Sequence, residues 1–452
     1  MKKSNLTIGI CLLCTVLLSG CADISFGEQT LLRPPRATGD SAEIQNIIRE
    51  EAGSSYSMKY PENGDHRSAV TIFTASGDKN EYAAAFYATE NDSKLNISII
   101  KHDTEKDPGE WVCLGSFSNP GTGVDRLILD DINNDGAEEI LVGWSTYNTG
   151  VNNLSAYSFE GEGAREMTLD ESYTDLVITD LTGDDLADII LLSLRNEKSP
   201  STAKLLQYSE QEKKPIAKFS IELDSEVTEF SSVSCGMIDN RCPGIILEGS
   251  KPGDLMTTQL IYFNKETNML ENPLVSVGST GTVNNITTRK DVITARDIDS
   301  DGITEVPVVS PMPAPPGTEA SSVCSMTSWK QLRIKDGSLK QKTSTVTNYN
   351  DGYYFIIPDK WNGNVTAVNH ADDRCIEFYK WNKDSSSLGE QLLSIKRFTQ
   401  TEWSKAEQDK YLVQKTINKK NNEYIIAARL YTTDESMKLS KEELERSVVV
   451  MK

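Results

Sequence analysis

The chain has 452 residues, of which 25% are charged, and a formal net charge of -21 at pH 7. A chain of this length normally forms two or three domains, each with its own core. The acidity opposes binding to nucleic acid and to anionic lipid headgroups and suits the binding of cations, although it also simply favours solubility.

The first 20 residues have the organisation of a bacterial export signal. Lys2 and Lys3 precede an apolar run from Leu6 to Leu18, which is too short to span a membrane as a mature helix. The sequence Leu18-Ser19-Gly20-Cys21 follows, and it resembles the lipobox of bacterial lipoproteins. The resemblance implies that Cys21 becomes the N-terminus and carries fatty acids such as palmitate, which attach it to the extracytoplasmic face of the cell membrane. Ordinary secretion, with Cys21 as a bystander, is the alternative.

Residues 21–60 are predicted to form a lipid-anchored tether and a short helix. The first part is polar and contains consecutive prolines, which is typical of an extended linker. Asp40 and Glu43 have the spacing of a capping box, with Asp40 as the N-cap. The isoleucines that follow share one helical face, at Ile44, Ile47 and Ile48. We therefore expect a helix from Asp40 to about Glu51.

Residues 61–347 contain a repeated unit of apolar strand, loop and second apolar strand. The copies begin near Phe73, Arg126, Leu176, Ser234 and Val292. Their spacing of roughly 50 to 60 residues is the length of one four-stranded propeller blade. A strand pair cannot bury both of its faces alone, whereas blades stacked around an axis can. The sequence predicts a mainly β fold, a β-propeller of about five four-stranded blades that closes near Thr347.

Residues 348–452 lose the repeat and mix strand with helix patterns. Strands are expected at Gly352–Pro358, Asn364–Val368, Cys375–Tyr379, Gln391–Lys396 and Glu423–Arg429. Helices are expected at Thr401–Tyr411 and Ser440–Val449, the second with a capping box formed by Ser440 and Glu443. The pattern predicts a small α+β domain.

The three stronger copies carry oxygen-bearing side chains at alternate loop positions. The first loop has Asp131, Asn133, Asp135 and Glu139, with glycine at Gly136. The third repeats this pattern with Asp297, Asp299, Asp301 and Glu305, and with Gly302 at the turn. The second has Asp180, Thr182, Asp184 and Asp188, with Asp185 in place of the glycine. Calcium prefers six to eight oxygen ligands, so these loops are candidate metal sites; metal-free turns rich in Asp, Asn and Gly are the alternative.

These loops resemble the FG-GAP or VCBS repeats of integrin-type propellers and of many bacterial surface proteins, over about residues 68–345. The resemblance implies one calcium ion per intact loop, bound between the first two strands of a blade, and two to three structural ions in all. Such ions neutralise clustered carboxylates and stiffen each hairpin.

Histidine and cysteine usage gives no sign of catalysis. The three histidines, His66, His102 and His370, fall in separate units, and no metalloprotease, phosphate-loop or dinucleotide motif occurs. Cys235 and Cys242 are candidates for a hairpin disulfide, with free thiols as the alternative.

The sequence thus predicts a membrane-anchored extracytoplasmic lipoprotein with a calcium-stabilised propeller that binds or scaffolds a protein or a glycan. No nucleic-acid partner is expected. Because acidic residues are abundant, a propeller-type polysaccharide lyase or hydrolase is the alternative.

Overall fold

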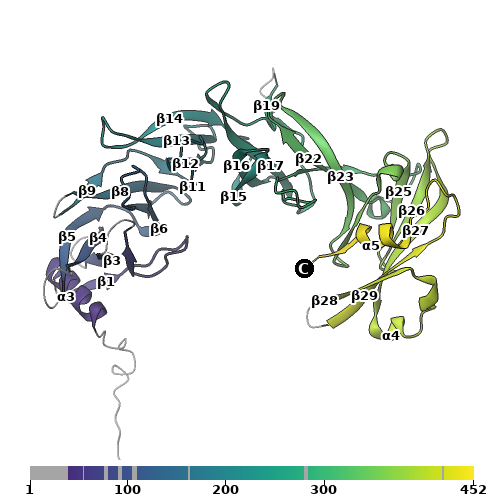
Figure 1. The fold of residues 1–452 in the computed structure, drawn as a ribbon, viewed down its shortest axis with the longest axis horizontal. Helices are drawn as coiled ribbons and strands as arrows, with labels where there is room; N and C mark the ends of the chain where they lie inside the picture. The colour runs from purple at the N-terminus through teal and green to yellow at the C-terminus, as the bar shows by residue number, and fades with distance from the viewer. Residues whose placement is uncertain are drawn as a thin grey trace, which may run out of the picture.

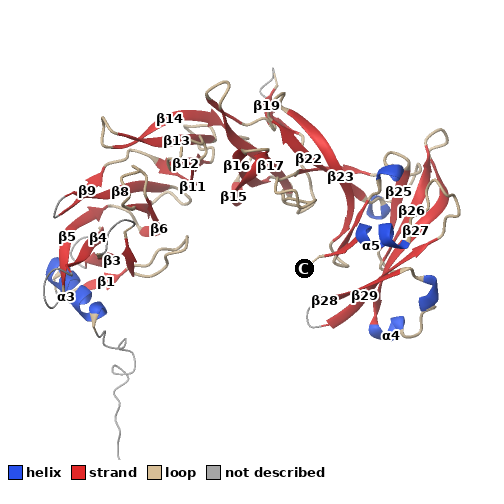
Figure 2. Ribbon diagram, in the orientation of Figure 1, coloured by secondary structure: helices blue, strands red, loops and turns tan. Residues whose placement is uncertain are grey.

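The computed structural model describes residues 39–451, apart from 54, 76–79, 90–93, 104–108, 161–162, 279–282 and 420–421. The expected export signal, Cys21 and the polar part of the tether lie outside the described residues. Within the described part, no helix has the length and apolar character needed to cross a membrane. Strands dominate this part of the chain (Figure 2).

Four antiparallel sheets follow one another in chain order. The first holds β1 (Tyr56–Met58), β2 (Val70–Thr74), β3 (Glu81–Thr89), β4 (Leu95–Asp103) and β5 (Glu110–Asn119). The second holds β6 (Gly123–Asp130), β7 (Glu139–Ser145), β8 (Asn152–Glu160), β9 (Gly163–Met167) and β10 (Ser172–Tyr173). The third holds β11 (Asp175–Thr179), β12 (Asp188–Ser193), β13 (Thr202–Ser209) and β14 (Lys214–Glu222). The fourth holds β15 (Glu229–Asp239), β16 (Cys242–Lys251), β17 (Leu255–Asn264) and β18 (Met269–Glu271).

Two five-stranded sheets follow a small hairpin of β19 (Val275–Val277) and β20 (Val283–Asn285). The fifth sheet holds β21 (Val306–Pro311), β22 (Ser325–Arg333), β23 (Ser338–Asn348), β24 (Tyr353–Ile356) and β30 (Val448–Val450). The sixth holds β25 (Val365–His370), β26 (Cys375–Asn382), β27 (Ser387–Thr399), β29 (Asn422–Leu430) and β28 (Val413–Lys419). Short 3-10 turns, η1 (Ala320–Ser322), η2 (Asp359–Trp361) and η3 (Gln408–Lys410), lie between strands.

The prediction of a mainly β, blade-like fold is confirmed, because each repeat copy contributes strands to its own antiparallel sheet. The sheets pack face to face, and period-two alternation divides each central strand between two cores. On β12, Ile189 and Leu191 pack with the second sheet. Ile190 and Leu192 on the same strand pack with the fourth sheet. Both faces of these strands are therefore buried.

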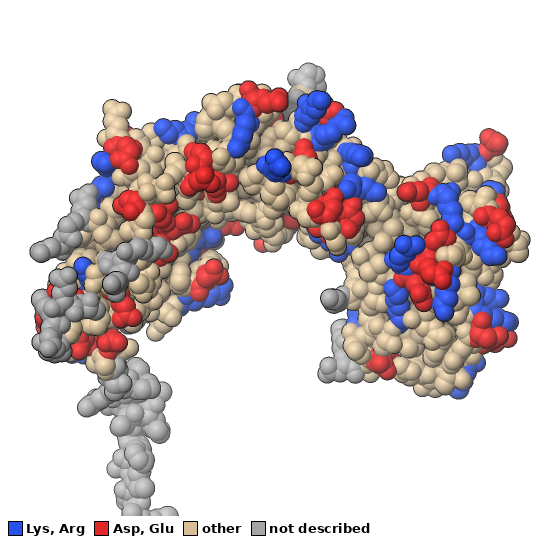
Figure 3. Space-filling model, in the orientation of Figure 1, with Lys and Arg blue, Asp and Glu red and all other residues tan. Residues whose placement is uncertain are grey.

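The sheets lie along an open arc, with the first and sixth sheets at opposite ends (Figure 1). The concave side remains hollow in the space-filling view (Figure 3). The expected closure near Thr347 is therefore not observed. The two sheets at the ends of the repeat, the first and the fifth, are covered by other elements. Helix α3 (Asp40–Ala52) packs on the first sheet, and the sixth sheet shares one large core with the fifth.

Helix α3 has the expected extent but a different start. Its N-cap is Gly39, and no side chain caps it, so the prediction of Asp40 as N-cap is wrong. The Asp40 carboxylate instead accepts a hydrogen bond of 3.3 Å from the indole of Trp111. Ile44 and Ile48 are fully buried against the first sheet, as the apolar stripe predicted.

The C-terminal strands form where they were expected, and β28 is additional. The helix expected at Thr401–Tyr411 is wrong in extent, because α4 (Gln400–Trp403) is a single turn. Helix α5 (Lys441–Ser447) has the predicted capping box of Ser440 and Glu443. It ends at a run of three valines, which favour strand and form β30 against β24. The fifth sheet therefore takes strands from both sides of residue 347.

All five cysteines of the described chain are free thiols. In the β15–β16 hairpin Cys235 is paired with Ile245, whereas Cys242 is paired with Asp239. The two cysteines are therefore out of register, and the structure has the free-thiol alternative.

Candidate metal centre

Each of the three acidic loops leads into a strand of a different sheet. The first joins β6 to β7 and the second joins β11 to β12. The third runs from Arg296, which forms an isolated bridge with Glu305, into β21. Each loop has two residues with positive φ, one of which is glycine: Asn134 and Gly136 in the first, Gly183 and Asp185 in the second, and Ser300 and Gly302 in the third. Glycine adopts this conformation without strain, so each loop has one unstrained and one less favourable residue at its turn.

The third loop brings three carboxylates together. Oxygens of Asp297, Asp299 and Glu305 all lie within 4.8 Å of one another. Asp297 is held by two backbone N–H groups, since Asp301 donates to it at 3.1 Å and Gly302 at 2.8 Å. This arrangement aims side chains from both ends of the loop at one point.

Glu305 is fully buried, and its two oxygens have different environments. Oε2 accepts a hydrogen bond of 3.1 Å from the Ile298 N–H, whereas Oε1 is buried without a partner. Burial, together with the charges of Asp299 and Asp301, raises the pKa of Glu305 to about 7. A buried carboxylate oxygen without a donor is costly unless a cation approaches it. The donor set therefore fits a hard divalent cation.

Lys342 on β23 supplies positive charge to the outer side of this loop. Its ammonium lies 2.6 Å from Asp301 Oδ2 and 3.1 Å from Asp299 Oδ2. Asp301 was a predicted ligand, but its carboxylate is occupied by Lys342 and by the Ile303 N–H at 2.9 Å. Three of the four predicted ligands thus converge, and Asp301 does not join them. The contact of Lys342 with this loop could not be predicted from the sequence, because the lysine lies 37 positions beyond Glu305 and belongs to no motif.

The first loop closes on itself through hydrogen bonds. Glu139 is buried and accepts from the Asn133 side-chain amide at 2.8 Å and from the Ile132 N–H at 3.2 Å. Asp131 accepts from backbone N–H groups, including that of Asp135 at 3.2 Å. Burial and the charge of Asp135 raise the pKa of Glu139 to about 8. Both Glu139 oxygens already have donors, so this loop does not present the orphaned oxygen found in the third.

The second loop holds a side-chain amide among its acidic and hydroxyl groups. Gln207 on β13 donates to Asp188 at 2.7 Å, and its amide nitrogen lies 3.4 Å from both Thr182 and Asp184. Asp180 accepts from backbone N–H groups within its own turn, including that of Gly183 at 2.6 Å. Gln207 was not identified from the sequence, because only the β12–β13 register brings it to the loop.

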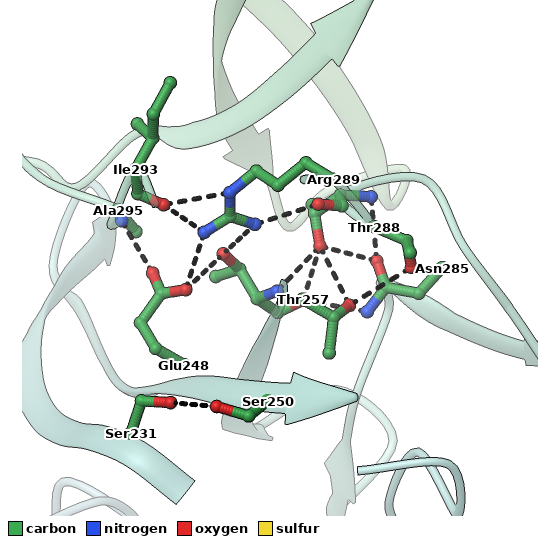
Figure 4. A network of polar contacts seen from close by, with 11 residues as sticks. Ser231, Glu248, Ser250, Thr257, Asn285, Thr288, Arg289, Ile293 and Ala295 are labelled. Carbon is green, nitrogen blue, oxygen red and sulfur yellow. Dashed lines mark hydrogen bonds and ion pairs between the residues drawn. The ribbon is translucent and has the colours of Figure 1, made fainter. Parts of the chain in front are cut away.

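A buried polar network fixes the approach to the third loop (Figure 4). Arg289 donates to Glu248 at 2.8 Å and to the Ile293 carbonyl at 2.9 Å, and Glu248 accepts from the Ala295 N–H at 2.6 Å. The repeat copy that begins near Val292 was expected to open with a strand at Val292–Arg296. No such strand forms, because the Ile293 carbonyl and the Ala295 N–H bond to these side chains and not to a neighbouring strand. On the other side of the loop, Thr304 donates to the Met237 carbonyl at 2.8 Å.

The described chain is thus a mainly β protein with propeller-like sheets and a candidate cation site where the fifth sheet meets the fourth.

No family model and no curated protein matches it. Among solved structures it is similar to a Lactobacillus plantarum protein, with 12% identity, a TM-score of 0.28, and coverage of 70% of this chain and 82% of that one. An exotype rhamnogalacturonan lyase shares 10% identity, with a TM-score of 0.30 and coverage of 85% and 92%. The Nup133 β-propeller domain of Vanderwaltozyma polyspora shares 11%, with a TM-score of 0.25 and coverage of 80% and 100%. Likeness at this level assigns neither a family nor an activity.

Proposed function

We propose that this protein is an extracytoplasmic lipoprotein of the FG-GAP/VCBS type, anchored through Cys21, whose stacked sheets are stiffened by calcium and serve as a binding or scaffolding module for a protein or a glycan. The observation that carries the proposal is the convergence of Asp297, Asp299 and Glu305, with one buried Glu305 oxygen that lacks a donor. The lipobox-like sequence before Cys21 supports the anchor.

Calcium would be held by these three carboxylates, with water or backbone carbonyls as further ligands. A bound ion would remove the repulsion among the acids and satisfy the buried Glu305 oxygen. The loop is tied to the fourth sheet at Ala295 and Thr304 and leads directly into β21 of the fifth. Calcium at this place would therefore stabilise the junction between the two sheets.

Two further calcium ions are proposed for the first and second loops, with weaker affinity. Binding at Asp131, Asp135 and Glu139 requires the Asn133 amide to turn its oxygen toward the ion. Binding at Asp180, Asp184 and Asp188 requires displacement of the Gln207 amide. We therefore expect affinity to decrease from the third loop to the first and then to the second.

The test is calcium-dependent stability of the purified protein. Calcium at one hundred times its dissociation constant is expected to raise the melting temperature by about 5 °C relative to chelator. Glu305→Gln should abolish most of this shift, because the buried anionic ligand is lost. The matched control is Glu319→Gln, an exposed acid on the loop between β21 and β22. A shift that is absent from the wild type, or equal in both variants, would contradict the proposal.

A further inference from the structure

A polar pocket of about 520 Å³ lies at the end of the β6–β7 hairpin opposite the first acidic loop. Its walls come from three parts of the chain: the segment after β1, the second sheet, and the start of β11. The inner strands β6 and β11 lie toward the concave side of the arc (Figure 1). The pocket is separate from the cluster of Asp297, Asp299 and Glu305, which leads into the fifth sheet, and it lies at the other end of the β6–β7 hairpin from the first loop.

The wall of this pocket is held rigidly around Asp125, which is 4% exposed. The Tyr173 hydroxyl donates to Asp125 at 2.6 Å, and the Asn63 amide donates to it at 2.8 Å. Arg126 bridges the Asp125 carboxylate at 2.7 Å and the Asp175 carboxylate at 2.9 Å. Gly143 makes this possible, because a Cβ there would lie 1.8 Å from the tyrosine oxygen. The polar groups are therefore preorganised before any ligand enters.

Asn152 is a polar residue of this wall whose side-chain amide has no hydrogen-bond partner among the described residues. Its side chain is 9% exposed and lines the pocket, and its amide forms no hydrogen bond with any described residue. Because Asn152 lines the pocket, both polar atoms of its amide are available to a molecule that enters. A ligand that both donates and accepts hydrogen bonds would satisfy the amide nitrogen and oxygen together.

The remaining groups define the class of ligand. Three acidic side chains and one arginine line the pocket, so its formal charge is negative and opposes phosphates and carboxylates. Hydroxyl and amide groups make up much of the rest of the wall. Two exposed tyrosines lie close in sequence to lining residues: Tyr60 is 62% exposed and Tyr147 is 80% exposed. Exposed aromatic rings offer flat apolar faces with a polar edge, which suit the C–H faces of a sugar ring.

We propose that this pocket binds a neutral saccharide. The inference rests on the proposed binding function and names its ligand class. Hydroxyl groups of a sugar both donate and accept, so they can pair with the carboxylates, the arginine and the Asn152 amide at once. Asp125 and Asp175 are both ion-paired to Arg126, which holds the two carboxylates in place in the wall.

The experiment is a binding screen of the purified protein against neutral mono- and oligosaccharides, with uronic-acid oligomers and polyamines as separate arms, followed by calorimetry. Neutral sugars are expected to bind. Asn152→Ala should weaken their binding about tenfold, the equivalent of one lost hydrogen bond. Tyr147→Ala should also weaken it, because this exposed ring directly follows the lining residue Thr146. Neither change removes a hydrogen-bond partner from a described residue, so both variants should fold.

The matched controls lie outside this pocket. Asn153→Ala changes the next residue of β8, which points to the opposite face of the sheet. Tyr349→Ala removes another exposed tyrosine, between β23 and β24. Both controls should bind like the wild type. Binding of polyamines or uronates alone, no binding in any arm, or equal losses in controls and pocket variants would overturn the inference. The comparison of Glu305→Gln with Glu319→Gln tests the loop that leads into the fifth sheet, whereas the sugar screen tests the second sheet, so either proposal can fail without the other.

Discussion

Lys342 already places one positive charge at the third acidic loop, where it contacts Asp299 and Asp301. It keeps these two carboxylates from repelling each other, and it also competes with any cation for Asp299. Lys342 therefore balances stability without metal against affinity for metal.

The variant Lys342→Met separates these two effects. Without calcium, its melting temperature should be lower than that of the wild type, because the acids lose their counter-charge. Calcium should then bind about tenfold more tightly, since Asp299 and Asp301 are released. Calorimetric titration, with Lys340→Met on the same strand as the control, measures the change. Weaker calcium binding in Lys342→Met would show that the lysine positions Asp299 for the ion.

The acidic ligands could be identified from the sequence, whereas the side chains that contact them from other strands could not. Asp297, Asp299 and Glu305 lie within nine positions, so their alternate spacing was visible in the chain. Lys342 and Gln207 reach their loops from neighbouring strands, through a register that one sequence does not specify. Local geometry was therefore predictable, and the charges and amides that modify it were not.

At the scale of elements, the Arg289–Glu248 ion pair holds the backbone of the segment that connects the fourth sheet to the fifth. The two side chains are 4% and 2% exposed, and together they hold the backbone of Ile293 and Ala295. The alternating apolar pattern at Val292–Arg296 predicted a strand there. The Ile293 carbonyl accepts from Arg289, four residues earlier, and the Ala295 N–H donates to Glu248 on β16, so these backbone groups do not pair with a neighbouring strand. By contrast, β12 formed as predicted because both of its faces meet apolar sheets.

Breaking this pair should destabilise the protein strongly. Arg289→Met leaves the buried Glu248 charge without a partner, and we expect a loss of about 3 to 5 kcal/mol in the free energy of unfolding. The double variant Arg289→Met, Glu248→Leu should recover part of it, because no buried charge remains. Denaturant unfolding measures both. Lys213→Met, which breaks an exposed ion pair with Glu210, should change little. A single variant as stable as the wild type would show that Glu248 is neutral when Arg289 is absent.

The whole molecule is an arc because its two end sheets are covered by elements outside the repeat. In a closed propeller the first and last blades cover each other. Here α3 covers the first sheet, and the sixth sheet covers the fifth through one continuous core. Capping elements of this kind are what stacked repeat proteins use at their ends. The repeat predicted the stack of sheets, but the spacing of copies does not distinguish a ring from an arc.

Removal of the N-terminal cap tests this explanation. In the variant Ile44→Asp, Ile48→Asp, two fully buried side chains become charged, so α3 should detach from the first sheet. The uncovered face includes Ala83, Ala85 and Ile100, and its exposure should cause self-association that increases with concentration. Light scattering after size exclusion detects this, with Asn46→Asp on the exposed side of the helix as the control. If the double variant stays monomeric and keeps its melting temperature, then the first sheet needs no cover, and the open arc requires a different cause.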